Sequence, residues 1–110
     1  SGLILVAKTY EAYYDLQAQL SSGRLLRDYT VLSHGCLPPA RRSISARIHW
    51  VEGSRSRSTV RHQGKPSSTR VHVLAAAARW GCALSLLAIQ IATGRRHQIR
   101  THASHVGIPT

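Results

Sequence analysis

The chain has 110 residues, 43% of them hydrophobic, and a formal net charge of +11 from fifteen basic and four acidic side chains. This length allows one small domain, and the apolar content excludes a wholly disordered chain. The positive charge favours a polyanionic partner, nucleic acid first, and thirteen of the basic residues are Arg, whose planar fork matches phosphate.

The cysteines and the apolar runs narrow the class of protein further. Cys36 and Cys82 are too few for a disulfide framework or a four-cysteine zinc site. We therefore expect both to be reduced and buried in an intracellular protein. There is no apolar stretch near 18 residues and no signal peptide, so we expect neither membrane spanning nor secretion. Both ends are expected to be cut rather than natural.

The first third of the chain predicts a strand, a helix and a second strand. The continuous apolar run 3–7 indicates a buried strand, and Thr9 is a suitable cap for a helix over 10–20. The alternating segment 27–33 indicates the second strand. The helix is expected to face a sheet through its apolar positions, which are Ala12, Tyr13, Leu16 and Leu20.

The rest of the chain predicts strands over 44–51, 69–76 and 83–92, followed by a helix over 97–106 that Gly107 ends. Val71, Val73 and Ala75 are expected on one face of their strand, and Trp80–Gly81 is expected to form a turn. The Arg/Ser-rich segment 52–68 carries no apolar period and is expected to be a mobile loop.

The order of these elements predicts the fold class. Strands follow one another without helical crossovers. We therefore expect an α+β domain over 1–110 with a mostly antiparallel mixed sheet and flanking helices.

Residues 93–102 hold three arginines, two histidines and a glutamine directly after an apolar strand. Gly94 marks a turn into a new helix, whose free N–H groups and positive dipole end suit a phosphate. Arg96 and Arg100 are one helical turn apart, so we expect them to share a face. The alternative is a solvated face of a surface helix, which is the usual role of a basic run.

Several familiar site classes are missing. The sequence has no Gly-x-Ser-x-Gly elbow and no Gly-rich phosphate loop. His97, His102 and His105 lie close in sequence, but without a carboxylate and in cationic surroundings, so we expect no metal. Partly buried histidines bonded to backbone or RNA are the preferred interpretation. Tyr29 is either a base-stacking aromatic or, more commonly, a core tyrosine with its hydroxyl at the rim.

The motifs resemble those of one known family. Residues 94–102, Gly-Arg-Arg-His-Gln-Ile-Arg-Thr-His, with 106–109 after them, resemble the closing signature of the RluA-type pseudouridine synthases. Weaker matches follow the family's order through the chain: residues 1–9, Arg27-Asp28-Tyr29 as a basic-x-Tyr motif, Gly64-Lys65-Pro66 with Thr69, and Ser85-Leu86-Leu87.

This resemblance implies an enzyme that isomerises uridine to pseudouridine in rRNA or tRNA by flipping the base, with an aspartate nucleophile and no metal or organic cofactor. It implies that Arg100 pairs with the aspartate, and that Tyr29 stacks on the uracil or takes part in proton transfer. It also implies a base pocket at Leu86 or Leu87. RNA contacts are implied for the basic signature, namely Arg95, Arg96, His97, Gln98 and His102. For Arg95 and Arg96 the alternative is a contact with the backbone of the motif itself.

One departure from the family is serious. The family's His-Arg-Leu-Asp stretch, which carries the nucleophile, is not among these residues, and none of the four carboxylates has a matching context. We therefore expect part of a catalytic domain that is inactive alone, or a degenerate paralogue that still binds RNA. The rival functions are a non-catalytic RNA-binding module and a small basic ribosome-associated protein. We expect a monomer in the cytoplasm or, in a eukaryote, the nucleus, mitochondrion or plastid.

Overall fold

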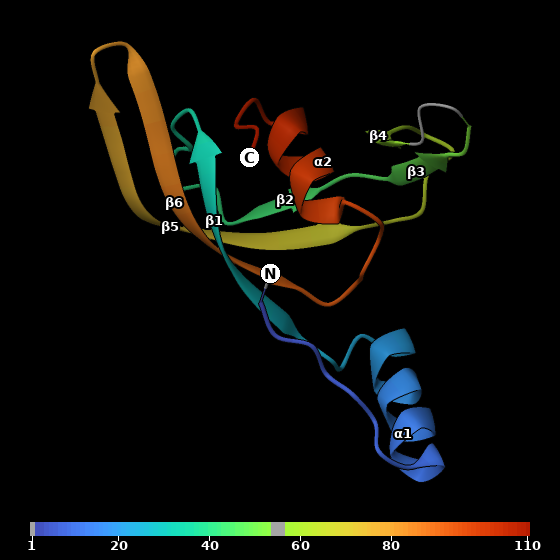
Figure 1. The fold of residues 1–110 in the computed structure, drawn as a ribbon. Coiled ribbons are helices and arrows are strands. Elements are labelled where there is room, and N and C mark those ends of the chain that lie inside the picture. Colours follow the sequence, from blue (N-terminus) through green and yellow to red (C-terminus); the bar gives the residue numbers. More distant parts are fainter. Residues whose placement is uncertain (1, 54–56) are drawn as a thin grey trace.

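The computed structural model describes residues 2–53 and 57–110. A four-stranded antiparallel sheet has the strand order β1-β6-β5-β2, and β3 and β4 form a separate antiparallel pair. The expected α+β class with an antiparallel sheet is confirmed (Figure 1). The elements are α1 (Tyr10–Ser21), β1 (Arg27–His34), β2 (Ser43–Ser45), β3 (Ile48–Val51), β4 (Arg57–Val60), β5 (Ser68–Arg79), β6 (Cys82–Ile91) and α2 (Gln98–His105).

The sheet is built around the long β5–β6 hairpin. Its two-residue turn, Trp80–Gly81, has positive φ at both positions, 50° and 75°, which matches the twist of the flanking strands. The predicted turn is therefore confirmed. A tryptophan at positive φ is uncommon, and its ring is covered by the Arg79 guanidinium at 4.4 Å.

The core lies between one face of this sheet and α2, which sits against the curved hairpin (Figure 1). Alternate residues of β6 are buried on that face, as the period of a half-buried strand requires. The buried cluster comprises Leu37, Ile44, Val71, Leu87, Ile89, Ile91, Ala103 and Ile108.

On β5 the register shifts between Val73 and Ala75. The prediction that Ala75 continues the face of Val71 is therefore wrong, and Ala75 is exposed.

The N-terminal segment differs from its prediction. Residues 3–7 form no strand, and Leu3–Val6 are exposed. The helix is confirmed, with the Ala12 N–H donating to Thr9 Oγ1 at 3.1 Å. However, α1 buries no residue, and it projects away from the sheet in Figure 1. Its apolar side therefore does not pack on the sheet as predicted, since none of its side chains is buried.

The predicted strand 44–51 is two strands in two sheets. β2 pairs with β5, whereas β3 pairs with β4. The two residues that connect them are held by the Ala46 N–H, which donates to the Ser67 carbonyl at 3.1 Å, and by Arg47 Nε, which donates to the Gly64 carbonyl at 2.9 Å.

The prediction of a mobile loop over 52–68 is wrong for most of the described part of that segment. β4 lies within it, and Gly64 and Ser67 are buried. A Cβ at Gly64 would lie 2.5 Å from the carbonyl carbon of Ile48, so the backbones pack closely there. Residues 54–56 of the predicted loop lie outside the described residues.

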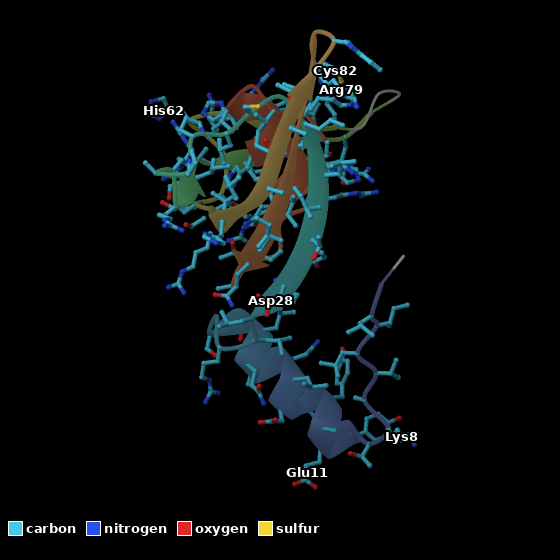
Figure 2. The ribbon with its side chains drawn as sticks, turned by 90° about the vertical axis from the view of Figure 1, so that its left-hand side faces the viewer. Lys8, Glu11, Asp28, His62, Arg79 and Cys82 are labelled. Carbon is cyan, nitrogen blue, oxygen red and sulfur yellow. The ribbon has the colours of Figure 1, made fainter. Side chains whose placement is uncertain are left out.

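Both cysteines are free, as predicted, but neither is buried. Cys82 begins β6 beside the hairpin turn, far from the sheet's core (Figure 2). Cys36 follows Gly35, whose φ of 90° turns the chain out of β1. The prediction of two core thiols is therefore wrong, because both residues lie where strands end.

We predict that Leu87→Ala lowers the free energy of unfolding by about 2–5 kcal/mol, because its fully enclosed side chain leaves a cavity. Leu86→Ala, on the opposite face and 37% exposed, should cost less than about 1 kcal/mol. Urea denaturation of the two variants measures the difference. Equal losses would contradict the assignment of the two strand faces.

Candidate active-site cleft

The basic signature forms a turn between β6 and α2. The left-handed residue of this turn is His97, with φ 53°, whereas Gly94 has no positive φ. α2 begins at Gln98, one residue later than predicted, and ends before Gly107, whose φ is 84°. Arg96 therefore precedes the helix, and the prediction that Arg96 and Arg100 share a helical face is wrong.

Gln98 is 2% exposed and holds the turn together from inside. Its Oε1 accepts from the Arg95 N–H and from Thr93 Oγ1, both at 3.1 Å. Its Nε2 donates to the Ser68 carbonyl at 3.0 Å and to Thr69 Oγ1 at 3.1 Å. All four hydrogen-bonding positions of the amide oxygen and nitrogen are used within the protein. The predicted direct contact of Gln98 with RNA is not supported by this enclosed placement.

His102 continues the same buried network, with 0% of its surface exposed. Its Nε2 donates to the Ala46 carbonyl at 3.2 Å, and its Nδ1 accepts from Thr69 Oγ1 at 2.8 Å. Burial lowers the pKa of His102, the hydrogen bond to Ala46 raises it, and the nearby His105 lowers it, with a net decrease. His102 is thus a neutral histidine bonded to backbone, as the preferred interpretation had it, and its side chain is not accessible to RNA.

A cleft of about 510 Å³ opens where β1 faces the signature turn and α2. Tyr29 on β1 and Arg100 on α2 both line it. Tyr29 is 43% exposed, and the β1 register opposite Ile89 puts it on the sheet face that carries α2. The structure thus brings the two predicted catalytic residues to one cleft. The lining residues are Arg27, Tyr29, Thr30, Val31, Ile91, Gly94, Arg95, His97, Gln98, Ile99, Arg100 and Thr110.

The cleft is electropositive. Its lining includes three arginines and His97 but no Asp or Glu side chain. Asp28, the acidic residue nearest in sequence to Tyr29, lies on the other sheet face, where it accepts from Gln90 Nε2 at 2.9 Å. An open cavity with clustered guanidinium groups suits phosphate or a carboxylate supplied from outside these residues.

Arg96 turns away from the cleft toward the β3–β4 pair. Its guanidinium lies 4.0 Å from the centre of the Trp50 ring, and His97 meets the same ring edge-on at 6.0 Å. The Ser58 hydroxyl donates to the Arg96 carbonyl at 2.5 Å. β3 and β4 thus support the turn from outside. Trp50 therefore supports the signature turn, and no feature of the surrounding sequence predicted this role.

Leu86 and Leu87, predicted as base-pocket residues, do not line the cleft. Leu87 is enclosed in the core, and Leu86 points to the opposite face because successive strand residues alternate. By contrast, Arg27 lines the cleft and was not singled out as a site residue. Its place two residues before Tyr29 in the basic-x-Tyr motif, on the same side of a strand, was the available signal.

The comparisons with known proteins give the family. A family model described as RNA pseudouridylate synthase matches residues 1–105, so the chain belongs to the RNA pseudouridylate synthase family. The resemblance to Rlu-type enzymes is confirmed at this level.

Individual relatives agree with the family. The chain is 36% identical to the uncharacterised RNA pseudouridine synthase YlyB of Bacillus subtilis, over 99% of this chain and 35% of that protein. It is 38% identical to the ribosomal large subunit pseudouridine synthase D of Nitrosomonas europaea, over 99% of this chain and 30% of that protein. The chain therefore spans about a third of the length of these curated relatives.

A solved structure shares the fold. Human RNA pseudouridylate synthase domain containing 1 superimposes with a TM-score of 0.79 at 26% identity, over 94% of this chain and 45% of that one. Among residues 2–53 and 57–110, no group of three metal-ligating side chains gathers. No helix in the same part of the chain has the length and apolar character needed to cross a bilayer.

We predict that acid destabilises the protein through His102. Its pKa is lowered in the folded state, so its contribution to stability is complete above its unfolded pKa of about 6.5 and is lost as the pH falls below that value. The thermal midpoint should drop below pH 6.5, and His102→Gln should flatten this drop. The exposed His62→Gln is the control. The same pH slope in His102→Gln as in the unaltered protein would contradict the assignment.

Proposed function

We propose that this chain is part of the catalytic domain of an RNA pseudouridine synthase, which converts uridine to pseudouridine in rRNA or tRNA. One observation carries the proposal: in a member of this family, Tyr29 and Arg100 line a single basic cleft. The relatives' names also point to RNA, and one of them to the large ribosomal subunit. We further propose that the protein acts as a monomer, in the cytoplasm or in an RNA-containing organelle.

The geometry suits the chemistry that the family resemblance implies. The uridine must leave its stack to enter the cleft, where Tyr29 offers an exposed aromatic face to the base. The bond between the sugar and N1 breaks, the base rotates, and C5 joins the sugar. The proton that C5 loses is balanced by the proton that N1 gains. Substrate and product are isomers, so the reaction needs no redox cofactor. The nucleophilic aspartate comes from outside these 110 residues, and Arg100 orients its carboxylate.

We predict that Arg100→Ala in the full-length protein lowers kcat at least about 100-fold, because a misplaced nucleophile loses its near-attack geometry. RNA affinity should change less than about tenfold, since Arg100 is one of several cations at the cleft. Single-turnover assays with pseudouridine mapping, alongside filter binding, measure both quantities. Arg100→Lys should stay impaired, because an ammonium lacks the two-pronged fork.

The same experiment separates the rival functions. A non-catalytic RNA-binding module or a basic ribosome-associated protein would form no pseudouridine before or after the substitution, and would lose only affinity. Equal losses of kcat and affinity in Arg100→Ala would contradict its orienting role.

We predict that RNA affinity falls at least about tenfold between 50 and 200 mM salt, if three or more phosphates are neutralised. The reason is the release of counterions from RNA by the arginines of the cleft and of the surrounding surface. Electrophoretic mobility shifts over a salt series measure the slope. An affinity that does not depend on salt would exclude an electrostatic RNA interface.

A further inference from the structure

The Arg27 side chain occupies a specific place in the cleft. Arg27 is the first residue of β1, opposite Ile91 at the end of β6. Its guanidinium lies against Gly94 of the signature turn. A Cβ built on Gly94 would lie 2.5 Å from Nη1 and 2.7 Å from Nη2 of Arg27. The guanidinium thus fills the space that a side chain at position 94 would take.

This contact explains why position 94 is a glycine. Gly94 does not have the positive φ that would require glycine for backbone reasons. The three nearest atoms to its virtual Cβ all belong to the Arg27 guanidinium. The glycine therefore leaves room for the Arg27 guanidinium, which lies against the backbone at position 94, and is not required by the backbone conformation of the turn.

One edge of the Arg27 guanidinium has no hydrogen-bond partner. Its Nε and Nη2 are enclosed, and neither makes a hydrogen bond within the described part of the chain. These two nitrogens form the side of the guanidinium that grips two oxygens of one oxyanion. Leaving buried charged donors unpaired is costly, so an arginine kept in this state calls for a ligand.

We propose that Arg27 binds a phosphate of the RNA backbone beside the target nucleotide. This inference rests on the proposed function, because it takes RNA as the occupant of the cleft. It adds a residue that binds the RNA backbone on the side of the cleft that Tyr29 lines.

Charge favours phosphate over a carboxylate as the ligand of Arg27. Besides Arg27, the cleft is lined by Arg95, Arg100 and His97, with no acidic side chain among its lining residues. The buried Nε of Arg95 is also without a partner. One carboxylate from outside these residues is already assigned to Arg100. An RNA strand brings a negative charge at every nucleotide, so a second phosphate can also pair with the Arg95 guanidinium.

The ligand reaches Arg27 from the cleft, because Arg27 is itself a lining residue. Binding then requires the side chains that cover this edge to shift, while the guanidinium stays against Gly94. The contact is then made in desolvated surroundings, where a charge-assisted hydrogen bond is strong.

The test uses full-length protein and RNA substrates that carry one neutral methylphosphonate linkage, moved position by position around the target uridine. With unaltered protein, one linkage next to the target should raise KM about ten- to a hundredfold. Arg27→Gln should raise KM by a similar factor on unmodified RNA, and neutralising that linkage should then have no further effect. In both cases kcat should change by less than about threefold, because binding rather than chemistry is lost.

Gly94→Ala provides a second variant that leaves Arg27 in place. Alanine is compatible with the backbone at position 94, but its methyl group displaces the guanidinium. It should reproduce the KM of Arg27→Gln and its insensitivity to the modified linkage. Arg79→Gln at the hairpin tip removes the same charge far from Asp28 and the start of β1, and should leave KM unchanged (Figure 2).

The results separate this inference from the proposed function. If the unaltered protein forms no pseudouridine, the proposed function is wrong and the role of Arg27 falls with it. If it is active but no single linkage matters, or Arg27→Gln responds to the modified linkage like unaltered protein, the phosphate contact is refuted. A loss confined to kcat would likewise refute it and point to a carboxylate ligand.

Discussion

A chain of buried hydrogen bonds holds the C-terminal half of the domain together. It runs from Thr93 through Gln98 and Thr69 to His102, and ends at the Ala46 carbonyl. It joins the end of β6, the start of β5, the helix α2 and the connection between the two sheets. Each of these side chains has its hydrogen-bond partners only when the others are in place. Buried hydrogen bonds therefore fix the position of the turn that leads to Arg100.

Much of the fold could be read from local patterns. The cap at Thr9, the Trp80–Gly81 turn and the alternating strand β1 were all predictable, because each depends on neighbouring residues. β4 was missed, since its Arg-Ser-Thr-Val sequence has no apolar period and its pairing partner lies in β3. The exposed apolar side of α1 was missed for the same reason, because a helix pattern does not say whether anything covers it.

The candidate site was predicted better as a segment than as individual residues. The signature turn does border the cleft, with Arg95 and Arg100 lining it. Its other polar residues have different surroundings, since Arg96 lies on Trp50 while Gln98 and His102 are enclosed. The difference arises at His97, where the left-handed backbone rotates the chain before α2 begins. The helical spacing assumed for the basic run does not apply across that residue.

The chain has two tryptophans, and they occupy opposite environments. Trp50 is half-buried beneath Arg96 and His97, whereas Trp80 is 89% exposed at the hairpin turn. Replacing Trp80 with Phe therefore leaves one indole, which lies against the turn that precedes Arg100. Its fluorescence gives an optical signal from the rim of the cleft without an added dye, and can report in real time whether that turn moves when RNA arrives.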